Sequence, residues 1–387
     1  MIYRENPRNG DKLSALGFGC MRFPRSFDEV KRLVTRAVES GINYFDTAYI
    51  YVGNEATLGR ALEGMRDRVK LATKLPPMSV KKSGDMERVF RTQLERLRTD
   101  YIDYYLIHML SDVATWERLC SYGILDWIAG KKRNGEIINI GFSYHGGRDE
   151  FKRLIDVYAW DFCMIQYNYL DEHNQAGRSG LEYASAKGLP VMIMEPLRGG
   201  TLANGLPSDV LNVFRDSGKN RSPAEWALRW VWNHPEVTLL LSGMNSMPVL
   251  EENISVASGA IPDMLTAEEL SIFKKAREMI SRRLKVPCTG CGYCMPCPAG
   301  VDIPTCLACY NDRYISGFVS AMQGYLQTTS FQKKPSNASK CIKCGKCEAH
   351  CPQSIQIRSE LKNVRQRLEP FFFKPVSAIA RKILRVK

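Results

Sequence analysis

The chain has 387 residues, of which 44% are hydrophobic and 25% charged, a composition typical of folded globular proteins. Its polar N-terminus and the lack of any run of roughly eighteen apolar residues argue against a signal peptide and a membrane span, so we expect a cytoplasmic protein. The net charge is +13, but no nucleic-acid-binding signature accompanies it, so nucleic acid is not expected as a partner.

The first part of the chain alternates short apolar runs with amphipathic stretches. Residues 27–41 place apolar side chains on one helical face: Val30, Leu33, Val34, Ala37 and Val38. Eight apolar runs have the length of buried strands: LGFGC, INYFD, VKLATK, IDYYLIH, IINIGFS, FCMIQYN, VMIMEP and TLLLSG. Strands that alternate with helices in this way predict a (β/α)8 TIM barrel. An open, doubly wound sheet is the alternative, although no GxGxxG follows the first strand.

A further helix is expected at residues 264–286, where Thr266 and Glu269 have the spacing of a capping box. This helix leads into a cysteine-rich region without a low-complexity linker. We therefore expect four parts: a barrel at 1–262, a connecting helix at 263–286, a ferredoxin-like domain at 287–360 and a basic tail at 361–387.

Polar side chains fall where three consecutive strands of the expected barrel end. Asp46, Lys74 and His108 close these strands, and Tyr51 follows in the first of their loops. Because active sites of such barrels lie at the C-terminal ends of the strands, we expect these side chains to meet. Their chemistry suits the reduction of a carbonyl group. Tyr51 would donate the proton, and a neighbouring Lys74, held charged by Asp46, would lower its pKa from about 10. His108 would orient the carbonyl oxygen.

Four ordered motifs, GINYFDTAYIYVGNEATLGRAL, LATKL, YIDYYLIH and IGFS, make most of residues 10–257 similar to the aldo-keto reductase family. With the cysteine-rich region, the chain resembles an iron–sulfur branch of that family. The resemblance implies NAD(P)H-dependent reduction of a small aldehyde or ketone. It also implies a catalytic tetrad made of Asp46, Tyr51, Lys74 and His108. The family binds its nicotinamide cofactor without a Rossmann fold, which accounts for the missing glycine motif.

The same resemblance implies four cofactor-binding residues: Ser143, Gln166, Glu252 and Asn253. The first two match residues that hold the nicotinamide carboxamide, and the last two match a loop near the adenine. Three places depart from the family pattern. Tyr144 replaces an asparagine, and Met194–Glu195 stands where many members have a ring-stacking tyrosine. Val249 replaces an arginine of NADPH-preferring members. We expect NADPH, with NADH as the alternative.

Ten of the thirteen cysteines lie between residues 288 and 351. The second run has the bacterial ferredoxin spacing C-x2-C-x2-C-x3-C-P, and the first run repeats it with a last gap one residue shorter. We predict two [4Fe–4S] clusters whose fourth ligands cross over. The expected ligand sets are Cys288, Cys291 and Cys294 with Cys351, and Cys341, Cys344 and Cys347 with Cys297.

Three alternatives to this assignment stay open. A single cluster is one, and zinc, which needs four ligands, is another. In the third, a further CxxC pair, Cys306 and Cys309, supplies a ligand, although these two cysteines are expected to be packed thiols. The insert at residues 312–329 is expected to be helical, as in the ferredoxin domains of multi-subunit redox enzymes.

How the clusters would exchange electrons with a nicotinamide is a separate question. A nicotinamide transfers two electrons and a cluster one, and the sequence has no motif for a flavin that could link the two. We therefore consider a redox partner protein. The alternative function is an electron-transfer or redox-sensing subunit whose barrel binds nucleotide without efficient turnover. The basic tail is expected to be a solvated terminus rather than a membrane-surface contact.

Overall fold

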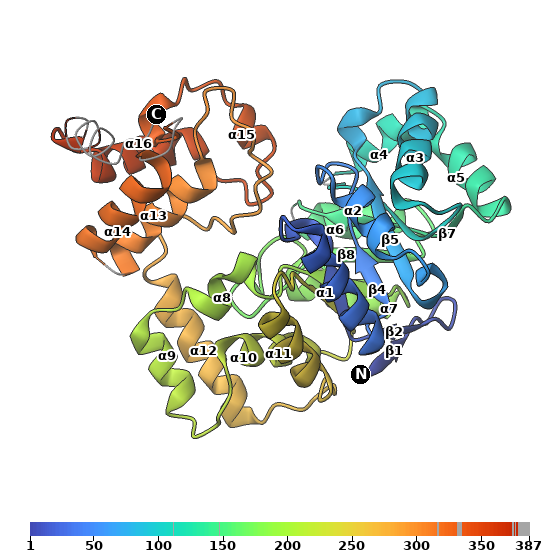
Figure 1. The fold of residues 1–387 in the computed structure, drawn as a ribbon, viewed down its shortest axis with the longest axis horizontal. Coiled ribbons are helices and arrows are strands. Elements are labelled where there is room, and N and C mark those ends of the chain that lie inside the picture. The colour runs from blue at the N-terminus through green and yellow to red at the C-terminus, as the bar shows by residue number, and fades with distance from the viewer. Residues whose placement is uncertain are drawn as a thin grey trace. The chain divides into compact units, whose positions relative to one another are not determined.

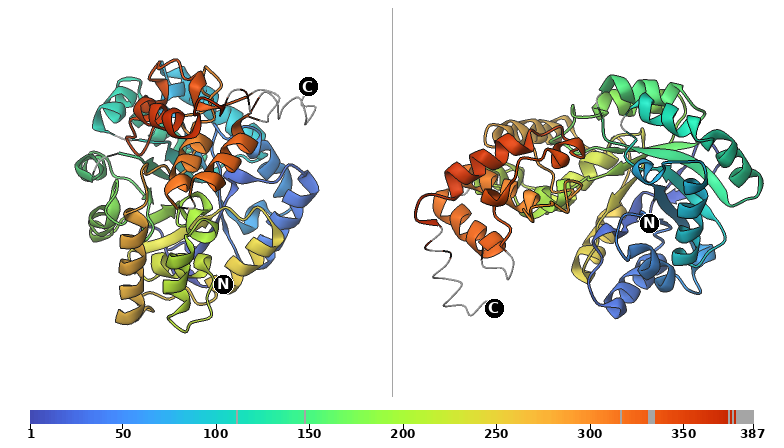
Figure 2. Two further views of the ribbon diagram at one scale, coloured as in Figure 1. Left: turned by 90° about the vertical axis from the view of Figure 1, so that its left-hand side faces the viewer. Right: turned by 90° about the horizontal axis from the view of Figure 1, so that it is seen from above.

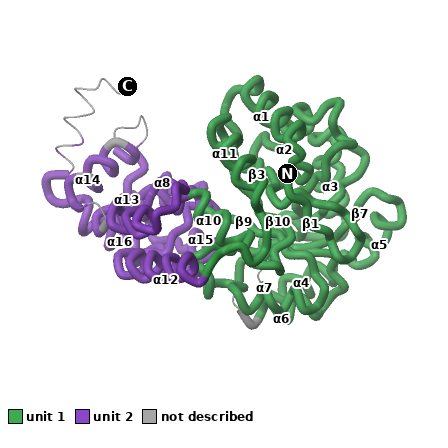
Figure 3. The backbone as a smooth tube through the Cα atoms, turned by 90° about the horizontal axis from the view of Figure 1, so that it is seen from below, with its two compact units in different colours: residues 1–197, 224–266 green, residues 198–223, 267–387 purple. Residues whose placement is uncertain are grey.

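The computed structural model describes residues 1–110, 112–146, 148–315, 317–330, 335–373, 375 and 377 (Figures 1 and 2). The chain forms two compact units (Figure 3). The first contains Met1–Leu197 and Ala224–Thr266, and the second contains Arg198–Pro223 and Ala267–Lys387. Of the basic tail expected at 361–387, residues 374, 376 and 378–387 lie outside the described residues.

Eight parallel strands close into a barrel in the first unit, which confirms the predicted TIM barrel. Pairing runs in chain order, and the last strand pairs with the first, Leu240 opposite Leu16, so the sheet has no open edge. The strands are β3 (Leu16–Gly19), β4 (Tyr44–Asp46), β5 (Lys70–Leu75), β6 (Ile102–Ile107), β7 (Ile137–Tyr144), β8 (Phe162–Gln166), β9 (Val191–Met194) and β10 (Val237–Ser242). Most are buried along their whole length, as expected for strands covered on both faces.

Helices lie outside the ring of strands (Figures 1 and 2). They are α1 (Phe27–Glu39), α2 (Asn54–Ala61), α3 (Gly84–Leu97), α4 (Val113–Ser121), α5 (Ile124–Arg133), α6 (Arg148–Asp156), α7 (Gly177–Ala186), α10 (Pro223–Trp232) and α11 (Met247–Ala257). In α1 the apolar face predicted from the sequence is the buried one. Gly59 lets α2 approach α3 closely, because a Cβ there would lie 2.6 Å from the Leu97 carbonyl oxygen.

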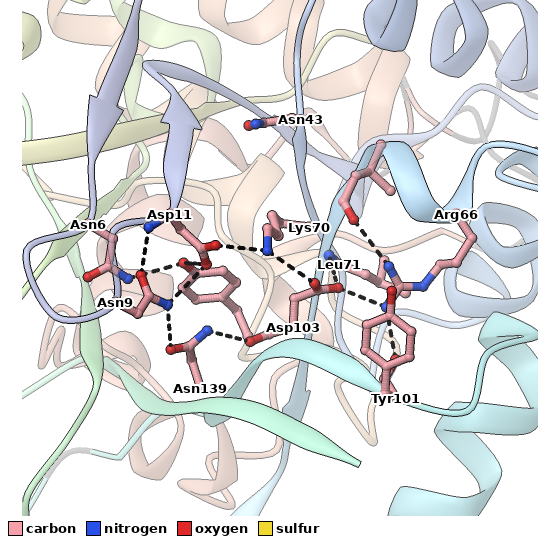
Figure 4. A network of polar contacts seen from close by, with 12 residues as sticks. Asn6, Asn9, Asp11, Asn43, Arg66, Lys70, Leu71, Tyr101, Asp103 and Asn139 are labelled. Carbon is pink, nitrogen blue, oxygen red and sulfur yellow. Dashed lines mark hydrogen bonds and ion pairs between the residues drawn. The ribbon is translucent and has the colours of Figure 1, made fainter. Parts of the chain in front are cut away.

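The N-terminal end of the barrel carries a hairpin that the sequence did not predict, made of β1 (Tyr3–Glu5) and β2 (Lys12–Ser14). A network of polar contacts ties its loop to the strands (Figure 4). Lys70 Nζ lies 2.9 Å from Asp11 Oδ1, and Asp103 Oδ2 accepts from Arg66 Nη2 at 2.8 Å. Asn139 Nδ2 donates to the Asp103 carbonyl at 2.9 Å. Ion pairs and hydrogen bonds therefore tie the loop of the hairpin and the first residues of the strands together at this end of the barrel.

The second unit is mainly helical, as predicted for the region that follows the barrel. It comprises α8 (Thr201–Asn204), α9 (Ser208–Arg215), α12 (Ala267–Ser281), α13 (Ile303–Ile315), α14 (Phe318–Tyr325), a π-helical turn (Leu326–Ser330), α15 (Lys346–Ala349) and α16 (Ile357–Leu368). Buried side chains of α13, α14 and α16 share one apolar core. α16 runs across the boundary expected at residue 360, because it buries an apolar face there. No helix of the described residues is long and apolar enough to cross a membrane.

Candidate functional site

The barrel places a buried ion pair where β4 and β5 end. Asp46 is the last residue of β4, and Lys74 is the last but one of β5, so parallel pairing brings both to the C-terminal rim. Lys74 Nζ lies 2.6 Å from Asp46 Oδ2 and donates to the Thr47 carbonyl, also at 2.6 Å. Both side chains are nearly inaccessible to solvent, at 2% and 7% exposure. The pair therefore holds a lysine charge at a fixed position inside the rim.

Tyr51 and His108 lie beside this pair. The ring centroids of Tyr51 and His108 are 5.9 Å apart with the rings nearly perpendicular, and Lys74 Nζ lies 5.3 Å from the centroid of the Tyr51 ring. His108 follows directly after β6 and is 1% exposed, whereas Tyr51 is only half-buried. The structure thus brings together the four side chains expected to meet, and Tyr51 is the most accessible of them.

The electrostatics of this cluster follow from burial and from the lysine. Burial alone would lower the pKa of Lys74, but the charges of Asp46 and of an ionised Tyr51 outweigh burial and raise that pKa. Burial raises the pKa of Asp46, against the opposing charge of Lys74. Burial and then the Lys74 charge hold the pKa of His108 well below its ordinary value. Lys74 is therefore the cation of the site, and His108 is a neutral imidazole.

Ser143 and Gln166, the two residues expected at the nicotinamide, lie near the ends of the neighbouring strands β7 and β8. Ser143 Oγ accepts from the Met109 backbone amide at 2.9 Å, which links it to the residue that follows His108. Gln166 is buried and donates to Asp171 Oδ2 at 3.0 Å. Both therefore share the C-terminal rim with the tetrad.

A chain of hydrogen bonds that the sequence did not predict continues from Gln166. Asp171 Oδ2 accepts from the amides of Gln166 and Asn168, at 3.0 and 3.1 Å. Gln166 Oε1 then accepts from Gln175 Nε2 at 2.8 Å, and Gln175 Oε1 lies 3.2 Å from His145 Nδ1. Because the carboxylate accepts, each amide has a fixed orientation, and His145 carries its proton on Nδ1. The feature of the sequence that could have pointed to this chain is His145, a polar residue that follows Ser143 and Tyr144 at the end of an expected strand.

Burial lowers the pKa of His145 to about 4. A proton on both nitrogens of His145 would lower the pKa of His108 further, after burial and the Lys74 charge, so the two histidines share one environment. Three other residues of this rim, Met109, Gln175 and Glu195, have φ angles of 52°, 53° and 54° although none is a glycine. Such left-handed conformations cluster at functional sites, where the surrounding structure holds them.

The two residues expected near the adenine lie on α11, which follows β10. Asn253 is 1% exposed and donates from Nδ2 to Ser242 Oγ at 2.7 Å, so it ties α11 to the end of β10. Glu252 is exposed. The structure therefore places them on different faces of the helix, with only Glu252 at the surface.

Four cysteines from both ends of the cysteine-rich region line one hollow in the second unit: Cys288, Cys291, Cys294 and Cys351. Its empty space is about 310 Å³, part of which is open to solvent, and its wall is apolar, with Ile303, Leu307, Ile355 and Ile357. The Thr289 hydroxyl in its lining is buried and has no hydrogen-bond partner among the described residues. These four cysteines are the first ligand set expected from the sequence.

The cysteines of the second expected set lie closer to the surface. Cys297, Cys341 and Cys347 pack, partly buried, against the apolar core, and Cys344 is exposed. Burial raises the pKa of Cys347, and the charges of Glu348 and Cys341 add to this effect. Lys340 Nζ lies 3.3 Å from the position a Cβ would take at Gly300, so the segment after Cys297 contacts the side chain of the residue before Cys341.

The remaining pair, Cys306 and Cys309, lies on α13 in the apolar core. Cys306 Sγ lies 3.8 Å from the Tyr325 hydroxyl, and Cys309 Sγ lies 4.0 Å from Thr328 Oγ1. Burial raises the pKa of Cys309 to about 11. Both thiols are therefore packed within the protein.

Among the described residues, no three His, Cys, Asp or Glu side chains converge tightly enough to hold a single metal ion.

Comparison with known proteins relates both parts of the chain to described families. The sequence model for "Aldo/keto reductase family" matches residues 15–277, and the one for "4Fe-4S dicluster domain" matches residues 287–355. Methylglyoxal reductase YeaE of Escherichia coli (strain K12) is 29% identical over 243 residues, which cover 58% of this chain and 80% of that protein. The uncharacterized oxidoreductase YrpG of Bacillus subtilis (strain 168) is 27% identical over 326 residues, which cover 73% of this chain and 95% of that protein.

Solved structures resemble this chain as well. The holo form of the aldo-keto reductase AKR11C1 from Bacillus halodurans has a TM-score of 0.61 and 28% identity, covering 71% of this chain and 96% of that one. An aldo/keto reductase from Klebsiella pneumoniae, solved in complex with NADP and acetate, has a TM-score of 0.56 and 25% identity, covering 70% and 94%.

Proposed function

The chain belongs to the aldo/keto reductase family, an oxidoreductase family, and we propose that it reduces an aldehyde or ketone with NAD(P)H, with Tyr51 as the proton donor. The main support for this proposal is the position of Lys74. This cation lies 2.6 Å from Asp46 and 5.3 Å from the Tyr51 ring, and it is almost fully buried. A buried cation favours the phenolate form of a neighbouring tyrosine, so it makes the phenol a better acid.

Each of the four side chains has one task in this proposal. Tyr51, the most accessible of them, gives its proton to the oxygen of the substrate. Asp46 keeps Lys74 charged and in place. His108 is neutral because of its burial, so it donates a hydrogen bond to the carbonyl oxygen and orients it without giving up a full proton.

The rim suits a nicotinamide cofactor. Ser143 and Gln166 lie at neighbouring strand ends, and Ser143 is joined to the backbone next to His108, so polar groups for a carboxamide lie on the same rim as the tetrad. A bound nicotinamide supplies the hydride. The Klebsiella relative was solved with NADP, which supports NADPH as the first choice, with NADH as the alternative. Asn253 and Glu252 would position the adenine end.

We propose further that the cysteine-rich domain holds two [4Fe–4S] clusters. The hollow lined by Cys288, Cys291, Cys294 and Cys351 fits one of them, since it gathers four thiols in an apolar wall beside a buried hydroxyl without a partner. For the second cluster we propose Cys341, Cys344 and Cys347 with Cys297. A cluster bound at either set accepts and releases one electron at a time.

The reductase is tested by steady-state oxidation of NADPH across a panel of carbonyl compounds that begins with methylglyoxal. Tyr51→Phe should lower kcat at least about 100-fold, the lower range for general acid catalysis, while NADPH binding stays unchanged. An unchanged rate would show that Tyr51 is not the proton donor. The cluster assignment is tested by iron and sulfide analysis after anaerobic purification. Cys351→Ala should lose about half of the iron, while Cys306→Ala should keep all of it.

A second candidate is an electron-transfer or redox-sensing subunit whose barrel binds nucleotide without efficient turnover. It is favoured by the bonding of Gln166 to Asp171 and Gln175, which ties the expected carboxamide ligand to the protein. Under this candidate, NADPH binds but no carbonyl compound accelerates its oxidation, and Tyr51→Phe changes nothing.

A further inference from the structure

The two sets of cysteines lie in different surroundings. The first set lines a hollow with an apolar wall, and each of its cysteines is at least partly buried. In the second set Cys344 is exposed. Ile342, which lies between Cys341 and Cys344 in the sequence, is 67% exposed, so an apolar side chain also reaches the surface here. The second set is therefore the one that faces the surroundings of the protein.

Three exposed lysines surround this motif: Lys340, Lys343 and Lys346. Together with Ile342 and Cys344 they form what we call the basic patch. Lys340 Nζ donates to the Pro335 carbonyl at 2.8 Å, an interaction that leaves its charge uncompensated. Within the described part of the chain, neither Lys343 nor Lys346 forms an ion pair. The patch thus carries three positive charges within seven residues of sequence.

The acidic residue next to the patch does not cancel these charges. Glu348 Oε2 lies 2.7 Å from Arg358, and its other oxygen accepts from the Arg358 backbone amide at 2.7 Å. Its charge is therefore matched by the arginine rather than by the lysines. Arg358 itself lies beside Gly345, 3.6 Å from the position a Cβ would take there. The surface around Cys344 stays net positive.

We propose that the basic patch is a docking surface for a small acidic protein that carries one electron at a time. The inference rests on the proposed function, because such a partner has a purpose here only if the second cysteine set holds a cluster. Charged rims of this kind steer a partner of opposite sign and fix its orientation. An exposed apolar side chain within the rim, here Ile342, supplies contact area once the partner is bound.

The position of the charges favours a protein over other anionic partners. The lysines alternate with the cysteines of one short segment rather than following a helix face, as a membrane-binding element would. Contact with them brings any partner to Cys344, the most exposed ligand position. A generic anionic surface would gain nothing from that proximity, whereas an electron carrier requires it.

The test uses the full chain, purified without oxygen, and an oxidised small acidic [2Fe–2S] ferredoxin as the probe. Binding is measured by calorimetry at about 20 mM and about 200 mM salt, where screening lengths differ severalfold. We expect binding at low salt that weakens at least about tenfold at high salt. Lys343→Glu with Lys346→Glu should weaken binding at low salt at least about tenfold, and the milder pair Lys343→Gln with Lys346→Gln should weaken it less.

The matched control is Lys274→Glu with Lys275→Glu, two exposed lysines of α12 whose reversal changes the net charge equally. It should change the dissociation constant less than about twofold. Iron content, about eight atoms per chain for two clusters, is measured in every variant. Full iron without ferredoxin binding, or equal effects of the two reversals, would overturn the docking surface. So would lysine-dependent binding to anionic vesicles instead of ferredoxin. Lysine-dependent ferredoxin binding with about four irons would support the surface and overturn the assignment of two clusters.

Discussion

The strand β5 carries a lysine near each end, and we expect the same substitution to cost much more stability at one lysine than at the other. Lys74 lies at the C-terminal rim, 2% exposed, paired with Asp46, which is 7% exposed. Lys70 lies at the N-terminal end, 33% exposed, paired with Asp11. Replacing either by methionine removes the charge and keeps the length of the side chain. Only Lys74→Met leaves a carboxylate buried without its counter-ion.

The cost of Lys74→Met follows from the ionisation of Asp46. An unpaired buried carboxylate takes up a proton, which at pH 7 costs about 1.36 kcal/mol for each unit between pH 7 and the unfolded pKa of about 3.9. This gives about 4 kcal/mol, within the range of about 3–5 kcal/mol for breaking a buried pair. The folded pKa of Asp46 is then raised above its unfolded value, so stability is lost as the pH rises. At pH 5 the same cost is about 1.5 kcal/mol.

The assay is urea denaturation followed by tryptophan fluorescence, which reports on the first unit because all six tryptophans lie at residues 116–232. Lys74→Met should lose about 4 kcal/mol at pH 7 and about 2.7 kcal/mol less at pH 5. Adding Asp46→Asn should abolish this pH dependence, because no carboxylate remains to titrate. Lys70→Met should lose at most about 1 kcal/mol and keep its kcat. An equal loss for Lys74→Met at both pH values would show that protonation of Asp46 is not the source of the cost.

Two further predictions concern other charged groups. Burial depresses the pKa of His145 to about 4, so as the pH falls the unfolded state takes up this proton before the folded state does. The free energy of unfolding should therefore fall as the pH drops from about 6.5 toward 4, by up to about 1.36 kcal/mol per pH unit. His145→Gln should remove that share of the slope in denaturation at stepped pH, whereas an unchanged slope would exclude this histidine as its source. Asp103→Ala removes the ion-pair partner of Arg66 at the opposite end of the barrel, and it should cost about 3 kcal/mol in the same assay while kcat is unchanged. A loss of kcat without a loss of stability would contradict the structural role.

The barrel was predictable because its signal is repeated and local. Each strand is a short apolar run, and α1 shows its buried face as a spacing of three and four residues. The clustering of Asp46, Lys74 and His108 was expected from one rule, that barrel strands end at the site, while Tyr51 was expected from its place in the loop after Asp46. The hairpin β1–β2 was not predictable in this way. Its strands have three residues each, and side chains such as Asp11 bind partners far along the chain.

The hydrogen-bond chain from Asp171 to His145 escaped prediction for a different physical reason. Only His145 follows β7, whereas the other members lie together at and after the end of β8. The loop carrying Gln175 also turns through a φ of 53° that a glutamine does not favour. The segment 198–223 likewise groups with the second unit through pairs such as Asp209 with Arg283, whose atoms approach to 2.5 Å. Such contacts depend on the folded path of the chain, and no local sequence pattern predicts them.

The cysteine spacing, in contrast, carried information about distant contacts, and the reason lies in the length of the motif. Three cysteines at three-residue steps surround one cluster, and a fourth just beyond cannot turn back to the same cluster, so a ligand must come from elsewhere. The structure has Cys351 in the hollow of the first set, although 57 positions separate it from Cys294. If the second set is completed by Cys297, each ligand set depends on both ends of the region. The intervening helices α13 and α14 then determine both sites, because they fix the distance between the two motifs.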